Sequence, residues 1–185
     1  MGESALLSEL MSYGFQLSGQ RVKLGFDSKA IEVTMAKLGN PVPELAELFG
    51  SHWPSMRYWL GLVELLGPED INYEHQRLLP GCLIIHHGFL VIGTNGSGSC
   101  FSYAVDDGHI YLISHESIAE NSVILAHGEC LPSVSAIKGV AMQKWDSMGS
   151  FLKWTFDELQ SMAHCGNLGI RGENWKGSVS GIVGK

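Results

Sequence analysis

Residues 83–115 constrain the fold of this chain more than any other stretch. Three short runs rich in β-branched and aromatic residues are separated there by Asn95-Gly96 and by Asp107-Gly108. Tight hairpin turns need residues that tolerate a positive φ, so Asn-Gly and Asp-Gly between such runs are strong hairpin signals. The pattern predicts a three-stranded antiparallel meander, with strands at about 89–93, 100–105 and 109–114.

Apolar residues at helical spacing predict helices on both sides of this meander. Side chains that could cap them stand at the expected places, with Asp27 or Ser28 before one helix and Asp146, Ser147 or Ser150 before another. Prolines in a first turn and glycines just past a last turn mark further boundaries. The predicted helices are 3–13, 28–38, 43–49, 54–66 and 150–162.

The predicted helix at 54–66 carries an apolar face that we expect to pack in the core. An acidic loop at 68–70 should follow it and lead into a polar stretch that ends at Arg77. Residues 82–85 predict a further strand, separate from the next one or continuous with it through a bulge at Gly88. The apolar face comprises Met56, Trp59, Leu60, Val63 and Leu66.

The patterns after the meander are weaker. Residues 116–121 fit a polar loop or a short helix, and residues 123–125 and 134–136 fit weak strands or packing segments. Recurrent glycines after residue 165 argue against a regular helix there, and Trp175 could anchor that stretch onto the body. A chain of 185 residues is long enough for one real core. We therefore predict one domain over 1–165 and a glycine-rich tail over 166–185.

Charge and hydropathy exclude several classes of protein. The chain has 12 Lys+Arg against 19 Asp+Glu and a net charge of −7. This balance argues against nucleic-acid binding, because neutralising phosphates needs clustered cations, but it permits a basic protein partner. The longest apolar stretch, 82–93, is too short to span a bilayer. The first residues also lack the basic and apolar regions of a secretory signal.

The spacing of the cysteines indicates the redox conditions in which the protein is expected to occur. Cys82, Cys100, Cys130 and Cys165 form no Cys-x-x-Cys pair and no disulfide framework. Reduced thiols in an intracellular protein are the default for such a pattern. We therefore expect a cytoplasmic protein with no membrane attachment.

Motifs for catalysis and cofactor binding are missing from the sequence. Residues 93–99 are rich in glycine but lack the lysine and the following helix of a phosphate-binding loop, so a hairpin turn explains them. His86 and His87 are adjacent, so on a strand their side chains would point to opposite faces. No Gly-x-Ser-x-Gly motif occurs. We expect a non-enzyme without cofactor or metal, and a small metal-dependent enzyme that uses the sheet histidines is one alternative.

Acidic residues flank the predicted sheet. Residues 68–130 contain a single basic residue, Arg77. If the loops converge, their carboxylates form an acidic rim suited to a basic protein surface. The alternative is a solvated edge that discourages strand pairing. The carboxylates are those of Glu69, Asp70, Glu74, Asp106, Asp107, Glu116 and Glu120.

Three segments occur in a characteristic order. Residues 89–105 combine a strand, a glycine-rich turn and a second strand with aromatic residues, residues 108–116 form a strand that ends in a histidine beside an acid, and residues 150–159 form a late helix. With the features from about 43 to 160, this order resembles the SUKH superfamily. That fold is shared by the fungal Smi/Knr-type cell-wall regulators and many bacterial immunity proteins.

The resemblance implies an α+β domain with a mixed, largely antiparallel curved sheet flanked by helices. It also implies a non-catalytic protein that binds and occludes a toxin domain of nuclease or deaminase type. A regulatory or scaffold protein of the same fold, bound to a cellular partner, is the alternative. The residues expected to contact the partner are Glu69, Asp70, Asp106, Asp107, His109 and Glu116.

Overall fold

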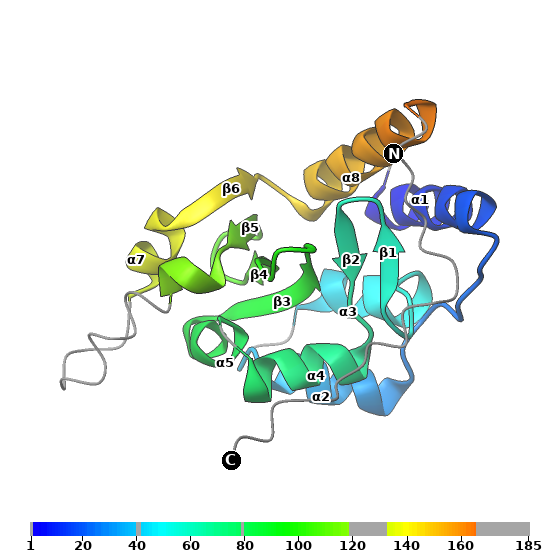
Figure 1. Ribbon diagram of the computed structural model, residues 1–185. Helices are drawn as coiled ribbons and strands as arrows, with labels where there is room; N and C mark the ends of the chain where they lie inside the picture. Colours follow the sequence, from blue (N-terminus) through cyan, green and yellow to red (C-terminus); the bar gives the residue numbers. More distant parts are fainter. Residues whose placement is uncertain (1, 40–41, 79, 119–132, 166–185) are drawn as a thin grey trace, which may run out of the picture.

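Six strands form one sheet in which every neighbouring pair is antiparallel (Figure 1). The computed structural model describes residues 2–39, 42–78, 80–118 and 133–165. Strands that are consecutive in the chain are neighbours in the sheet. They are β1 (Tyr58–Leu60), β2 (Val63–Leu65), β3 (Phe89–Thr94), β4 (Cys100–Ala104), β5 (Ile110–Ile113) and β6 (Ala141–Trp145).

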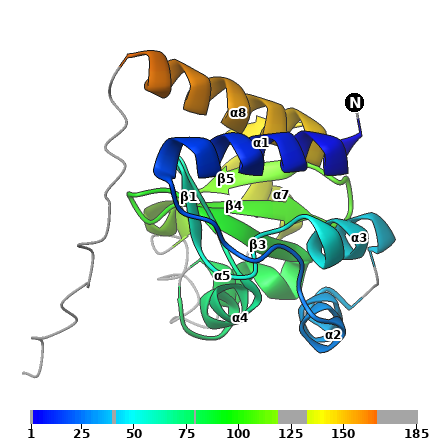
Figure 2. The same ribbon diagram turned by 90° about the vertical axis from the view of Figure 1, so that its right-hand side faces the viewer.

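Helices lie on both sides of this sheet, so the predicted α+β class is confirmed. The helices α1 (Glu3–Ser18) and α8 (Met148–His164) run side by side over one face, as Figure 2 shows. On the other side, α4 (Pro68–Arg77) and α5 (Gly81–Ile84) pack against β3. The remaining helices are α2 (Ser28–Ala36), α3 (Pro43–Ser51), the 3-10 helix η1 (Ile85–His87) and α7 (Val134–Gly139), and residues 115–118 are also helical.

Aromatic side chains join α8 to the sheet. The ring of Phe101 in β4 lies 5.2 Å from that of Phe151 and 6.1 Å from that of Trp154, measured between centroids. Trp145 of β6 lies 4.7 Å from Trp154. Offset and tilted rings at such separations attract one another in addition to burying apolar area. These four rings therefore form the centre of the core between α8 and the sheet.

The predicted meander is confirmed as β3, β4 and β5. The carboxamide of Asn95 accepts the N–H groups of Ser97 and Ser99, and Gly98 takes the positive φ (86°) of that turn. In the second turn, Asp107 accepts the N–H of His109, and Gly108 has φ 71°. Each turn is thus stabilised by its own side-chain hydrogen bonds and one glycine.

The predicted helix at 3–13 is confirmed but continues to Ser18. Gly14 does not end it, since this glycine lies inside the helix against β1. A Cβ at Gly14 would lie 2.6 Å from a side-chain carbon of Leu60. The glycine therefore allows the helix to approach the sheet closely.

Two further predicted helices begin at residues named in the sequence analysis. Asp27 caps α2 by accepting the N–H of Ala30, and Ser147 caps α8 in a reciprocal pair with Ser150. Such caps satisfy N–H groups that have no partner within the helix. The helix predicted at 43–49 is confirmed as α3.

The helix predicted at 54–66 is wrong, because these residues form the β1–β2 hairpin. Gly61 has φ 68° in its turn, a conformation that interrupts a right-handed helix. The apolar face predicted for the core is divided as a result. Leu60, Val63 and Leu66 are buried, whereas Met56 is 58% exposed and Trp59 is 50% exposed.

Two assignments on either side of α4 also need correction. The acidic loop predicted at 68–70 is the first turn of α4, with Pro68 at its start and Glu69 and Asp70 beside the free N–H groups. The strand predicted at 82–85 is helical, as α5 followed by η1. A short apolar run suits a buried strand and a buried helical turn equally well, so periodicity does not separate them.

The last corrections concern α7 and β6. Residues 134–136 belong to α7, which Ser133 caps by accepting the N–H of Ala136. The edge strand β6 is missing from the sequence prediction because Met142, Gln143 and Lys144 are all exposed and show no alternation. The segment 123–125 and the tail 166–185 lie outside the described residues.

Candidate functional site

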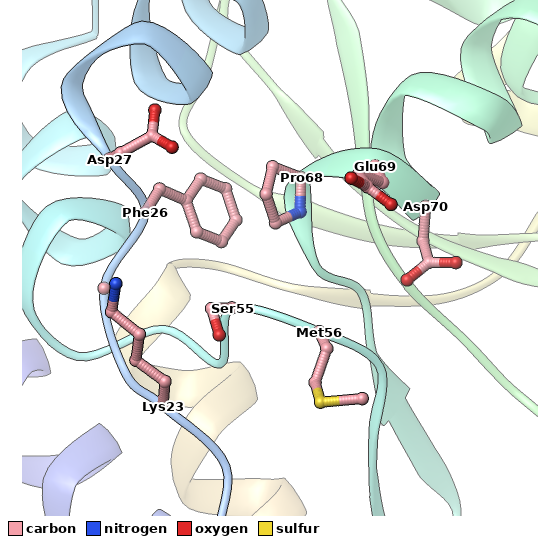
Figure 3. A pocket seen from close by; sticks show the side chains of 9 residues that line it. Lys23, Phe26, Asp27, Ser55, Met56, Pro68, Glu69 and Asp70 are labelled. Carbon is pink, nitrogen blue, oxygen red and sulfur yellow. The ribbon is translucent and has the colours of Figure 1, made fainter.

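A hollow of about 250 Å³ opens between the segment that precedes α2 and the start of α4 (Figure 3). The exposed Met56, which precedes β1, forms part of its wall. The acids Glu69 and Asp70, expected to contact a partner, also line it. The full lining is Lys23, Gly25, Phe26, Asp27, Ser55, Met56, Pro68, Glu69 and Asp70.

Backbone hydrogen bonds hold the walls of this hollow. The N–H of Ser55 donates to the carbonyl of Lys23 at 2.9 Å, and the N–H of Gly25 donates to the carbonyl of Trp53 at 2.7 Å. A Cβ at Gly25 would lie 2.5 Å from the backbone oxygen of Gly50. Glycine therefore allows the segment before α2 to lie against α3.

The hollow combines an apolar floor with charged margins. Phe26 points towards Pro68 across it (Figure 3). Asp27 already accepts one backbone N–H as the cap of α2. Neither Lys23 nor Glu69 has an ion-pair partner within the described ranges. Their charges are thus available to a ligand.

Next to the hollow, Arg57 lies among three carboxylates. Its Nε donates to Asp70 at 2.7 Å, and its Nη1 lies 3.5 Å from Glu64. The hydroxyl of Thr94 donates to the same Glu64 oxygen at 2.9 Å. Glu74, one helical turn after Asp70 on α4, is the third carboxylate whose charge interacts with Arg57.

Burial is the main influence on the two glutamates of this cluster. It raises the pKa of Glu64, although the Thr94 hydroxyl and Arg57 oppose the shift. Burial likewise raises the pKa of Glu74, opposed by Arg57. Both carboxylates are therefore held in surroundings that disfavour an unpaired negative charge.

The other predicted contact residues lie elsewhere. Phe89 pairs with Ala104 at one end of β3, whereas Thr94, which contacts Glu64, is at the opposite end. Asp106 and Asp107 follow Ala104 directly. The acidic residues therefore form two separate groups and not the single rim that converging loops would produce. Glu74 is buried on α4, Glu116 is exposed on the helical residues 115–118, and Glu120 lies outside the described residues.

At the β4–β5 turn, Lys138 of α7 forms ion pairs with both aspartates. Its Nζ lies 2.7 Å from Asp106 and 2.7 Å from Asp107. Burial would raise the pKa of Asp107, but hydrogen bonds from Lys138, Tyr111 and the His109 N–H outweigh it and lower the pKa to about 2. These contacts attach α7 to the turn, which gives the aspartates and His109 a structural role.

Replacing Lys138 by methionine should lower the free energy of unfolding by about 1 kcal/mol, since it removes a charge-assisted hydrogen-bond donor to both aspartates. The pKa of Asp107 should rise toward its ordinary value. Because this pKa is lowered in the folded state, its contribution to stability is present above the unfolded pKa of 3.8 and is lost as the pH falls toward about 2.

Carboxyl-carbon NMR titration and urea unfolding measure both effects of the Lys138 substitution. Lys153→Met is the matched control, because Lys153 pairs with Asp157 on the exposed surface of α8. An unchanged Asp107 pKa in Lys138→Met would show that Lys138 does not hold the turn.

The histidines and cysteines of the described ranges do not converge on a metal site. In the described part of the chain, no group of three or more His, Cys, Asp or Glu side chains is arranged to hold a metal ion. His75 is buried between Gly81 and Val91 with both ring nitrogens hydrogen-bonded. Burial raises the pKa of the Cys100 thiol, which disfavours the reactive thiolate.

Several residues of this site were missed in the sequence analysis. Arg57 and Glu64 stand in the segment predicted as a helix, so their pairing with the start of α4 was not expected. Lys23 and Asp27 were not linked to Glu69 because no local pattern connects them. An available signal was Gly61, which marks a turn within 54–66 and would have placed Trp59 and Glu64 opposite each other on two strands.

Comparisons with protein-family models, curated proteins and solved structures find no significant match to this chain. No helix among the described residues combines the length and the apolar character needed to cross a membrane.

Proposed function

We propose that this chain is a non-catalytic protein-binding module that engages a basic protein through the hollow and the side chains beside it. The observation that carries the proposal is the pairing of a largely exposed Met56 with the unneutralised carboxylate of Glu69 in one hollow. Apolar anchors surrounded by polar groups are typical of protein interfaces. The net charge of −7 adds long-range attraction for a basic partner.

The resemblance to the SUKH superfamily supports a narrower form of this proposal. In that form, the protein is an immunity protein that occludes a toxin domain of nuclease or deaminase type. Such domains bind polyanionic substrates, so a basic active-site cleft is expected in them and an acidic surface complements it. A regulatory protein that binds a cellular partner through the same hollow is the alternative.

Glu69 is the strongest contact candidate among the six predicted residues, whereas Asp70 already has a salt bridge to Arg57. Asp106 and Asp107 share the ammonium group of Lys138, and Asp107 also lies 3.1 Å from His109, so both aspartates already have an ion-pair partner within the protein. Glu69 is exposed and unpaired in the first turn of α4. A partner's cation gains more from an uncompensated carboxylate than from one that already has a salt bridge.

The test is capture of the partner with the full-length tagged chain, followed by binding and inhibition assays with the purified pair. Glu69→Lys should weaken binding at least about tenfold, mainly through slower association, because it reverses a charge at the interface. Glu9→Lys makes the same charge change on the exposed side of α1 and should have little effect.

A captured nuclease or deaminase domain whose activity is blocked by this chain would support the immunity function. A housekeeping partner that binds through Glu69 would favour the regulatory alternative. Equal binding by the Glu69→Lys and Glu9→Lys variants would remove the hollow from the interface.

A further inference from the structure

Beside the hollow, the guanidinium of Arg57 is the one cation of the described residues that interacts with three neighbouring carboxylates. With all four groups ionised, two negative charges remain without a cation among Arg57, Glu64, Asp70 and Glu74. Glu74 is the most isolated of them, because the residue is only 5% exposed and its carboxylate has no hydrogen bond or ion pair to any described residue. A carboxylate that belongs to a largely buried residue and lacks a hydrogen-bond partner is unfavourable for folding, so its presence points to a ligand.

An exposed aromatic ring lies next to these carboxylates. Trp59 pairs directly with Glu64 across the β1–β2 hairpin. Side chains of directly paired residues project from the same face of a sheet, so the indole lies beside the Glu64 carboxylate. The ring also approaches Gly96 of the β3–β4 turn, where a Cβ would lie 3.9 Å from its Cη2 atom. Half of the Trp59 surface therefore stays open to solvent.

We propose that Glu64 and Glu74 accept an arginine side chain from a protein partner, with Trp59 as the surface on which its guanidinium stacks. The identity of the donor as a protein rests on the proposed function. Guanidinium is planar and carries five N–H donors, so it can bond two carboxylates while one face lies on an indole. A metal ion suits the site less well, because the described residues contain no group with metal-binding geometry.

Arg57 contacts Asp70 closely and Glu64 only at a longer distance, so a second guanidinium can bind at Glu64. Its bond to Asp70 is short, at 2.7 Å, whereas its Nη1 lies 3.5 Å from Glu64. An incoming arginine would displace only the longer contact, and Arg57 would remain on Asp70. Since Asp70 also lines the hollow (Figure 3), the arginine site adjoins the proposed interface.

The experiment is an NMR titration of the full-length protein with N-acetyl-arginine amide. N-acetyl-citrulline amide is the control probe, because it has a similar planar end group without the charge. The indole N–H signal of Trp59 is identified by its loss in Trp59→Phe. We expect the arginine probe to shift this signal in a saturable way and the citrulline probe to leave it in place.

Variants test the two carboxylates. Glu74→Gln and Glu64→Gln should each weaken binding of the arginine probe about tenfold or more, since each removes a charge-assisted hydrogen bond. Glu47→Gln, at an exposed position of α3, should bind the probe as the unmodified protein does. Two carboxylate variants are used, because if one of them fails to fold, binding of the arginine probe can still be measured with the other.

Equal shifts from the citrulline and arginine probes would overturn this inference, as would unchanged affinity in both carboxylate variants. The outcome is separable from that of the proposed function. Saturable arginine binding without any toxin partner would keep the arginine site and reject the immunity function. A complex with a toxin, formed by a protein that does not bind the arginine probe, would support the immunity function and reject the arginine site.

Discussion

Replacing Phe101 by alanine is expected to lower the free energy of unfolding by about 4 kcal/mol. The ring is buried between the sheet and α8, within 5.7 Å of Trp145 and 5.2 Å of Phe151. Truncation removes the transfer free energy of the ring and leaves a cavity that rigid neighbouring strands cannot fill. It also removes the ring–ring attraction that joins α8 to β4 and β6.

Urea unfolding followed by tryptophan fluorescence measures this loss. Trp59→Ala is the informative control, because Trp59 is large but half exposed, and its truncation should cost less than about 1 kcal/mol. If the two substitutions destabilised the protein equally, the core would not be centred on the face of the sheet covered by α8.

Acidification should weaken the fold through His75, by about 3 kcal/mol between pH 6.5 and pH 4. Its ring is buried between α4 and β3, where Nδ1 donates to the Gly81 carbonyl and Nε2 accepts the Val91 N–H. The bond from Val91 requires the neutral ring, because a protonated Nε2 cannot accept it, and β2 is too short to pair with Val91 in place of the histidine.

Burial lowers the pKa of His75 to about 4, and the charge of nearby Lys37 acts in the same direction. In the unfolded chain the imidazole takes up a proton near its ordinary pKa of 6.5. The unfolded state thus binds more protons between these values, and stability falls as the pH decreases through that range. Above pH 6.5 this contribution is fully present.

His75→Gln is the matched variant for this prediction. A glutamine can donate to Gly81 and accept from Val91 without titrating, so it should flatten the loss of stability between pH 6.5 and pH 4. Urea midpoints of both proteins across this range provide the measurement. The difference between them is the relevant quantity, because Glu64 and Glu74 have raised pKa values and contribute in the opposite direction. Parallel curves would contradict the role assigned to His75.

The central meander could be predicted because its turns are specified by neighbouring residues. Asn95 and Asp107 hydrogen-bond to N–H groups within four positions of themselves, and Gly98 and Gly108 take the positive φ values. The same holds for the caps of α2 and α8. Such local interactions are present in any fold that contains these residues, so sequence patterns identify them reliably.

The β1–β2 hairpin could not be distinguished from a helix in this way. Its strands have three residues each, too few for a clear alternation, and Leu60 and Val63 also satisfy helical spacing. Contacts that are distant in the sequence decide the matter, since β2 pairs with β3 and Gly61 lies against Met162 of α8. Tertiary pairing thus outweighed the local helical pattern.

Some residues of the candidate site could likewise be predicted from the sequence, whereas others depend on tertiary contacts. The sequence predicted the acidic start of α4 as a contact region, although as a loop. Its cation could not be identified, because Arg57 lies in the hairpin that was predicted as a helix. Likewise, Lys138 follows the segment 134–136 that was predicted as a weak strand or packing segment, so its place on α7 and its pairing with Asp106 and Asp107 were not foreseen.

By itself, the sequence of this protein determined the turns, the helix caps and the excess of acidic residues. Only the tertiary structure decided which acids are neutralised and which remain available. The reason is the short range of the interactions, because an ion pair needs its two groups within about 4 Å. The bonds from Thr94 to Glu64 and from Lys138 to Asp106 join residues 30 and 32 positions apart, and packing alone brings them together.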